Sequence, residues 1–274
     1  MALPPKKNSS KGSKYYEVGS LAKGFRILET VTRGGGLTVT EIARKMGQNR
    51  STIHRFVLTL VDLGFITVNE NGKYTPTLKL FELAQQNDIL STVTLLARKH
   101  MLELKTRHEN TVYFTQLIDR DLMTLEVVQG SELIRADGRP GAKGAAHYQA
   151  SGKAILAFLP DPKIEDYLAA GALEAQTPNS ITNPNVLKKE LDRVRRTGYA
   201  LDNEEWALGI RGIAVPLISA DRKSGYGISI SGHSLIFSAD KALAAVDDLM
   251  RARNRLADEL GWTLPPDIPG RLIK

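Results

Sequence analysis

The sequence predicts an α+β protein in two parts, a small basic N-terminal domain and a larger mixed C-terminal domain. Three observations predict this: helical spacing of apolar residues before residue 65, a hairpin pattern directly after it, and a change to a two-residue period from Thr111. The chain has 274 residues, 42% of them apolar, so it can bury a substantial core in one or two domains.

The first predicted element is a helix over residues 18–33. Its apolar side chains recur at helical spacing, and the three glycines at residues 34–36 then end it. The spaced residues, which we expect to face a core, are Leu21, Phe25, Leu28 and Val31.

A second helix is predicted to begin at Thr38, because residues 38–41 form a capping box. The Thr38 hydroxyl can accept a hydrogen bond from the backbone N–H of Glu41, and the Glu41 carboxylate can reach back to Thr38. Gly47 can adopt the positive φ that a sharp turn needs, and Asn49 is a good cap for a third helix. The sequence therefore predicts two short helices joined by a tight turn.

A hairpin is predicted directly after the third helix. Residues 65–68 and 73–75 are its arms, and Asn71-Gly72 in the polar tip is typical of a type I′ turn. The helix itself has one apolar stripe, which turns its polar face outward. The stripe consists of Ile53, Phe56, Val57 and Leu60. Two short helices followed by such a hairpin indicate a winged helix-turn-helix.

The rest of the chain alternates between helical and strand patterns. Residues 77–108 are predicted to form a long helix, which would serve as a linker and dimer seam. Strands are expected at residues 111–118, 122–128, 211–219 and 226–232. Helices are expected at residues 151–159, 164–170, 186–197 and 238–260. This mixture indicates an α+β domain.

Positive charge is concentrated in the N-terminal part. Residues 1–79 hold 13 Lys+Arg against 5 Asp+Glu, a balance of +8, whereas the remainder holds 24 against 25, a balance of −1. This asymmetry is typical of a nucleic-acid-binding domain joined to a neutral one. The alternative is that the lysines before residue 15 only keep a flexible arm in solution.

Three absences narrow the class of protein. Cysteine is absent, which excludes disulfides and thiolate metal sites and favours a reducing cytoplasm. The sequence contains no run of about 18 uncharged apolar residues, so it predicts no membrane span. The N-terminus carries lysines without the apolar segment of a secretory signal. We expect a cytoplasmic protein with no membrane partner.

The outward face of the third helix suits double-stranded DNA, because an α-helix fits the major groove and its N-terminal side chains reach base edges. Arg50 and Arg55 can donate to guanine or phosphate, and His54 can contact a base edge. A solvated helix face is the alternative, which the caps, turn, hairpin and local charge together disfavour. The predicted DNA-binding residues are Thr38, Thr40, Arg50, Ser51, Thr52, His54, Arg55 and Lys73.

Several segments resemble the IclR family of bacterial transcriptional regulators. They are GFRILETVTRGGGLTVTEIARKMGQNRSTIHRFVLTLVDLGFI, YTPTLKLFELA, YQASGKAILAFL, GYALDNEEWALGIRGIAVPL and GISISG, and the resemblance covers nearly all of residues 18–262. It implies a dimer or dimer of dimers whose C-terminal domain is GAF-like, has an antiparallel sheet and binds an effector. The expected parts are a flexible basic arm (1–17), the winged helix-turn-helix domain (18–79), a linker helix (80–108) and the effector-binding domain (94–264).

The resemblance also implies which residues line the effector pocket. They are Leu133, Ala136, Ala150, Ser151, Asp202, Gly212, Ser229 and Ser231. Backbone N–H groups of Ala150 and Ser151, at a helix start, suit a carboxylate. Ser229 and Ser231 alternate along a strand, so both hydroxyls point to one face. The alternative for the two serines is that their hydroxyls form hydrogen bonds within the sheet. Trp206 can lie either at the pocket or in the core, which is the more usual place for a lone tryptophan.

The chain departs from the family pattern at three positions near this pocket. Gly212 stands where cysteine is common, Gln149 where threonine is common and Ala145 where proline is common. Glycine at 212 enlarges the pocket, and Gln149 can add an amide. No particular ligand is therefore transferred from the family.

Enzymatic sites find little support. The segment around Lys153 lacks the glycine and the Ser/Thr of a phosphate-binding loop, and the five histidines show no paired metal-ligand spacing. Ser231, His233 and Asp202 could form a hydrolase triad, but no nucleophile elbow accompanies them. We expect neither catalysis nor a cofactor nor a metal ion.

Together these features predict a ligand-responsive transcriptional regulator. A dimer would bind a palindromic operator, and a small organic acid bound in the C-terminal domain would change the spacing or mobility of the DNA-binding domains. A catabolic operon is the expected target. The alternative is a metabolite-modifying enzyme with a DNA-binding appendage.

Overall fold

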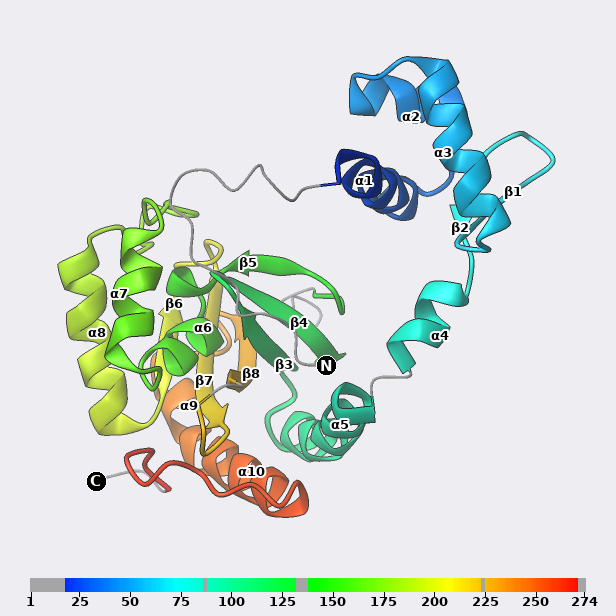
Figure 1. The fold of residues 1–274 in the computed structure, drawn as a ribbon. Helices are drawn as coiled ribbons and strands as arrows, with labels where there is room; N and C mark the ends of the chain where they lie inside the picture. Colours follow the sequence, from blue (N-terminus) through cyan, green and yellow to red (C-terminus); the bar gives the residue numbers. More distant parts are fainter. Residues whose placement is uncertain (1–17, 86–87, 132–137, 223–224, 271–274) are drawn as a thin grey trace. The chain divides into compact units, whose positions relative to one another are not determined.

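The computed structural model describes residues 18–85, 88–131, 138–222 and 225–270. The chain divides into two compact units, Met1–Asp88 and Ile89–Lys274, each described below by itself. Figure 1 labels the elements of both units.

The N-terminal unit contains four helices and a two-stranded hairpin among its described residues. They are α1 (Gly19–Arg33), α2 (Val39–Met46), α3 (Arg50–Asp62), β1 (Ile66–Val68), β2 (Tyr74–Pro76) and α4 (Lys79–Gln85). Buried side chains of α1, α2, α3 and the hairpin form one core. This arrangement is the predicted winged helix-turn-helix.

Helix α1 packs with a different set of residues from the one predicted. Ile27, Leu28 and Val31 are buried, whereas Leu21 and Phe25 are 60% and 59% exposed. The periodicity gave the correct helix, but only its C-terminal half lies against α2 and α3. Spacing alone does not show how far along a helix its partners extend.

The predicted caps of α2 and α3 are confirmed. The backbone N–H of Glu41 donates to Thr38 Oγ1 at 3.3 Å, and the backbone N–H of Thr38 donates to Glu41 Oε2 at 2.8 Å. Gly47 ends α2 with a φ of 61°, and Asn49 Oδ1 accepts from the backbone N–H of Thr52 at 3.0 Å. These local bonds fix the turn that leads into α3.

The turn of the hairpin differs from the predicted type I′. The backbone N–H of Gly72 donates to Asn69 O at 2.9 Å, and Val68 pairs with Tyr74, so five residues connect the strands. Gly72 has a φ of 67°, but Asn71, which a type I′ turn also places at positive φ, does not. Asn69 Oδ1 accepts from the backbone N–H groups of Asn71 and Lys73. These bonds favour the longer loop.

The C-terminal unit is built on a six-stranded sheet of order β5-β4-β3-β8-β7-β6, in which every described pair is antiparallel. Its strands are β3 (Thr111–Ile118), β4 (Asp121–Val128), β5 (Lys143–Ala145), β6 (Ala200–Asn203), β7 (Ile210–Ile218) and β8 (Gly225–His233). Its helices are α5 (Asp88–His108), the 3-10 helix η2 (Ala146–Tyr148), α6 (Ala150–Leu156), α7 (Asp161–Ala169), α8 (Pro184–Thr197), α9 (Ala239–Ala244) and α10 (Val246–Glu259).

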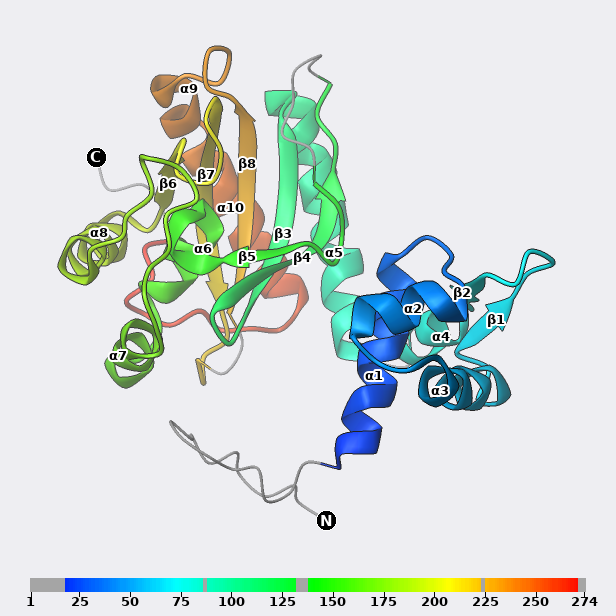
Figure 2. The ribbon, with the colours of Figure 1, turned by 90° about the horizontal axis from the view of Figure 1, so that it is seen from above.

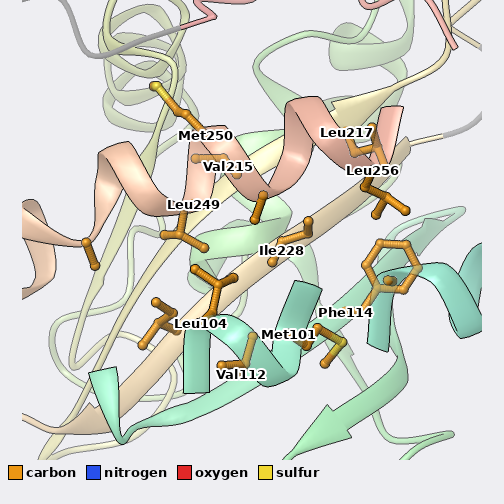
Figure 3. Packing of buried hydrophobic residues seen from close by; sticks show 14 of the residues in the cluster. Met101, Leu104, Val112, Phe114, Val215, Leu217, Ile228, Leu249, Met250 and Leu256 are labelled. Carbon is orange, nitrogen blue, oxygen red and sulfur yellow. The ribbon is translucent and has the colours of Figure 1, made fainter. Parts of the chain in front are cut away.

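Helices cover both faces of this sheet (Figures 1 and 2). Helices α5, α9 and α10 pack on one face, and α6, α7 and α8 pack on the other. Figure 3 shows the first core, where Met101 and Leu104 of α5 meet strand residues and Leu249 and Leu256 of α10. The predicted α+β class is confirmed, and this three-layer arrangement leaves α6 on the face that carries the candidate pocket.

Helix α6 lies unusually close to the sheet. A Cβ on Gly227 would lie 2.8 Å from Ser151 Cβ, and one on Gly225 would lie 2.6 Å from Ile155 Cγ2. The two glycines of β8 therefore admit α6, all of whose residues are buried. This contact places Ala150 and Ser151 against the sheet.

Two long predicted helices each span two of the described helices. Residues 77–108 contain α4 and α5, and residues 238–260 contain α9 and α10, with Ala245 between the latter two. Val93, Ala97, Met101 and Leu104 of α5 belong to the C-terminal core. The second half of the expected linker helix therefore packs as a core helix of the C-terminal unit.

Candidate functional site

The N-terminal unit presents the polar face of α3 to solvent. Arg50, Ser51, His54 and Arg55 are all exposed, whereas Ile53 and Val57 on the opposite face are fully buried. Ser51 Oγ donates to Asn49 Oδ1 at 2.7 Å, which ties its hydroxyl to the cap of α3. One helix face thus carries two guanidinium groups and one imidazole at its N-terminal end.

The side chains of the other predicted DNA-binding residues differ in their exposure and in their hydrogen bonds. Thr40 and Lys73 are exposed, on α2 and in the hairpin loop. The Thr38 hydroxyl is engaged with Glu41 in the capping box. Thr52 is half-buried. Thr40 and Lys73 can approach a ligand directly, while Thr38 mainly holds α2 in place.

The C-terminal unit contains a cavity of about 130 Å³ on the α6 side of the sheet. Five of the eight predicted pocket residues line it: Ala150, Ser151, Asp202, Ser229 and Ser231. Gly212 lies beside them, because a Cβ there would be 2.9 Å from Ser231 Oγ and 3.6 Å from Asp202 Cβ. Leu133 and Ala136 fall outside the described residues.

Sheet register brings these residues together from distant parts of the chain. Asp202 of β6 pairs with Gly212 of β7, and Gly212 pairs with Ser231 of β8. Ser229, which lies two residues before Ser231 in β8, pairs with Tyr113 of β3. Residues at this spacing share a face of the sheet. The predicted alternation of Ser229 and Ser231 is therefore confirmed as one polar row under α6.

The cavity also has walls that were not predicted. Tyr113, Thr115 and Thr124 line it from β3 and β4. Gln149, which the family pattern places near the pocket, lines it from the residue before α6. Trp206 lines it as well and is only partly buried, so of the two places considered for it the structure supports the pocket. A lone tryptophan gives no pattern to decide between these positions, and only the loop after β6 places it.

Asp202 is held at the edge of the cavity by backbone donors. Its Oδ1 accepts from the N–H groups of Glu205 at 2.7 Å and Trp206 at 3.2 Å. The side chain is 5% exposed, and burial raises the pKa of Asp202 to about 7, against the lowering effect of these bonds and of Lys153. Asp202 can therefore exist protonated or ionised near neutral pH.

A buried ion pair joins α6 to the loop that carries Trp206. Lys153 Nζ donates to Glu205 Oε1, and these side chains are 1% and 8% exposed. Burial raises the pKa of Glu205, and its Oε2 has no hydrogen-bond partner among the described residues. The sequence contained both residues within the quoted family segments but gave no signal that they pair.

Two family models match the two units. The IclR helix-turn-helix domain matches residues 20–70, and the bacterial transcriptional regulator IclR C-terminal model matches residues 87–256. The chain belongs to the IclR family. It is therefore a DNA-binding transcriptional regulator and not an enzyme.

Relatives of this IclR-family regulator match over most of their length. It is 30% identical to the HTH-type transcriptional regulator KdgR of Dickeya chrysanthemi, over 89% of this chain and 81% of that protein. It is 31% identical to the transcriptional repressor IclR of Escherichia coli, over 79% of this chain and 80% of that protein.

Solved structures agree with this assignment. The Thermotoga maritima IclR structure is 32% identical, covers 90% of this chain and all of its own, and has a TM-score of 0.73. An IclR homolog from Microbacterium hydrocarbonoxydans, complexed with 4-hydroxybenzoate, has a TM-score of 0.79 at 24% identity, over 88% of this chain and 99% of its own. The latter likeness concerns the fold alone.

Two of the three residues considered as a hydrolase triad line the cavity of this IclR-family protein. Ser231 and Asp202 line the cavity, but His233, the third member of the imagined triad, is not among the described lining residues. Within the ranges that the structure describes, no cluster of three His, Cys, Asp or Glu residues is placed to hold a metal ion. In the same ranges, no helix is long and apolar enough to cross a membrane.

Proposed function

We propose that this regulator binds a small organic acid in the cavity of its C-terminal unit and changes its affinity for operator DNA in response. The observation that carries the proposal is a cavity lined by Ser151, Ser229 and Ser231. Ser151 Oγ is buried and has no hydrogen-bond partner among the described residues. A buried donor without a partner is costly, so a ligand that accepts its hydrogen bond gains that free energy on binding.

The size of the cavity supports a small effector. A cavity of about 130 Å³ is close to the engineered cavity of about 150 Å³ that accepts benzene. Ring or short aliphatic acids fit this range, and hydroxyl groups can donate to both carboxylate oxygens. The complex of the Microbacterium homolog with 4-hydroxybenzoate, an aromatic acid, is in keeping with this class. Because α6 has only seven residues, we assign the recognition to hydroxyls rather than to its N-terminus.

For DNA, we place α3 in the major groove and the hairpin beside the phosphate backbone. Arg50, His54 and Arg55 are the proposed base contacts, while Thr40 and Lys73 contact phosphates. In this proposal a dimer binds a palindromic operator of a catabolic operon, since two identical domains match two half-sites. The protein meets this DNA in the bacterial cytoplasm.

Replacing Arg50 or Arg55 with Ala is expected to weaken operator binding by about 1–3 kcal/mol if the arginine contacts a base. Fluorescence anisotropy with DNA from upstream of the protein's own gene, at several salt concentrations, measures the loss. Arg196→Ala is the control, because Arg196 is exposed on α8 of the C-terminal unit. Unchanged affinity and unchanged salt slope in both variants would contradict the placement of α3.

Ser229→Ala is expected to abolish the effector response while DNA binding persists, because it removes one of the paired donors. A ligand that binds only the folded state raises the melting temperature, so a thermal-shift screen of organic acids reports binding. We expect at least one acid to stabilise the wild type and not the variant. Ser20→Ala, an exposed serine in α1, controls for the substitution itself. A variant that responds like the wild type would remove Ser229 from the site.

A further inference from the structure

We propose that the cavity binds its carboxylate effector together with one proton on Asp202, which then donates a hydrogen bond to the bound carboxylate. The proposal rests on the effector site proposed above and names the charge state that this site accepts. One proton is taken from solvent for each anion bound to ionised protein, and no covalent bond changes.

The geometry places the Asp202 carboxyl where a ligand would meet it. Asp202 lines the cavity. The Cβ of Asp202 and the Oγ of Ser231 both border the space that a side chain at Gly212 would occupy. Both backbone donors of the Glu205 loop bind the same oxygen, Oδ1, of Asp202. The other oxygen, Oδ2, is therefore the atom left to exchange a proton with a ligand.

Cationic groups near Asp202 are already engaged or lie at the surface. Lys153 of α6, whose charge acts on Asp202, is paired with Glu205. Among the described lining residues, Lys143 of β5 is the only cation, and it is exposed.

Among the described residues, the other neighbours add no cationic side chain to the wall of the cavity. Tyr113, Thr115 and Thr124 on β3 and β4, and Ser229 and Ser231 on β8, contribute uncharged groups to the wall. Arg211 of β7 donates instead to Asn203 Oδ1 and to two backbone carbonyl oxygens. An anionic ligand would thus face an anionic Asp202, and the one cation among the described lining residues, Lys143, is exposed to solvent.

Two carboxylates in contact in a buried site do not both stay ionised, because their repulsion is poorly screened. Protonation of Asp202 removes this repulsion and supplies a donor. Burial already raises the pKa of Asp202 to about 7, so the proton is available near neutral pH. Below that pH the free protein holds the proton already. Above it, each pH unit is expected to weaken binding about tenfold.

The test measures the dissociation constants of benzoate, 4-hydroxybenzoate and propanoate between about pH 6 and pH 8. Their carboxyl groups stay ionised over this range, and Trp206 fluorescence reports occupancy of the cavity. For an acid that binds, wild-type affinity is expected to fall about tenfold from pH 6 to pH 8. In Asp202→Asn, the amide oxygen can accept hydrogen bonds from the same backbone N–H groups, and the amide NH2 can donate at any pH. The affinity of this variant is expected to change less than about twofold over the same pH range.

The outcomes separate the two proposals. Binding to the wild type with no dependence on pH, or an equal dependence in Asp202→Asn, overturns the proton linkage and leaves the effector site standing. Failure of all three acids to bind even at pH 6 overturns the carboxylate site together with its linkage. If the variant does not fold, calorimetry of the wild type at pH 8 in buffers of different ionisation heat counts the protons. Uptake of about one proton supports the proposal, and none overturns it.

Discussion

Glu205→Gln is expected to destabilise the C-terminal unit by about 3–5 kcal/mol. The substitution keeps the size of the side chain but leaves the Lys153 ammonium group, 1% exposed, without its anionic partner. A buried charge that loses its partner keeps the full cost of desolvation. The same change frees the loop that carries Trp206 and donates two hydrogen bonds to Asp202, so effector binding should be lost as well.

Urea unfolding followed by tryptophan fluorescence measures this loss. The two tryptophans, Trp206 and Trp262, both lie in the C-terminal unit, so the signal reports that unit alone. Glu165→Gln is the matched control, because its ion pair with Lys188 is exposed and should contribute less than about 1 kcal/mol. The double replacement Lys153→Met with Glu205→Leu should recover much of the stability. A loss no larger than that of Glu165→Gln would contradict a buried ion pair.

Gly152→Ala is expected to destabilise the same unit by about 2–3 kcal/mol, although alanine normally favours a helix. An added Cβ would lie 2.1 Å from Ala146 O and 2.5 Å from Ala146 Cα, which are backbone atoms of η2. Either α6 or η2 must then move. Since α6 carries Ala150 and Ser151, the movement should also deform the cavity and weaken effector binding.

The same urea titration measures this second variant. Gly270→Ala is its control, because an added Cβ there meets no atom within 4 Å. We expect the control to unfold within about 0.5 kcal/mol of the wild type. If the Gly152→Ala protein is as stable as the wild type and binds effector equally well, then α6 does not pack against η2 too closely to admit a methyl group.

The N-terminal unit could be predicted in detail because its determinants are local. A capping box, a glycine at positive φ and an asparagine cap lie within twelve residues of one another, and each has the hydrogen bonds or the backbone angle expected of it. The face of α3 followed from the spacing of Ile53, Val57 and Leu60. What failed there depends on neighbours: Leu21 and Phe25 follow the helical spacing but lie beyond the core, and the hairpin turn depends on the side chain of Asn69.

The cavity could be predicted only in part, because it is made by register between distant strands. Ser229 and Ser231 could be placed on one face by counting along a single strand. The positions of Asp202 and Gly212 next to Ser231 depend on β6 and β7, and β6 has only four residues. These positions came from the family resemblance. The Lys153–Glu205 pair, the wall from β3 and β4, and Trp206 required the structure.

The central claim is that an acid bound in the C-terminal cavity changes the affinity of the N-terminal domain for DNA. The most direct measurement is the dissociation constant of upstream DNA with and without an acid that stabilises the protein, for the wild type and Ser229→Ala. We predict a change of at least about fivefold in the wild type and none in the variant, as coupling of two sites requires. Occupancy of the cavity, reported by Trp206, together with an unchanged DNA affinity would contradict the claim.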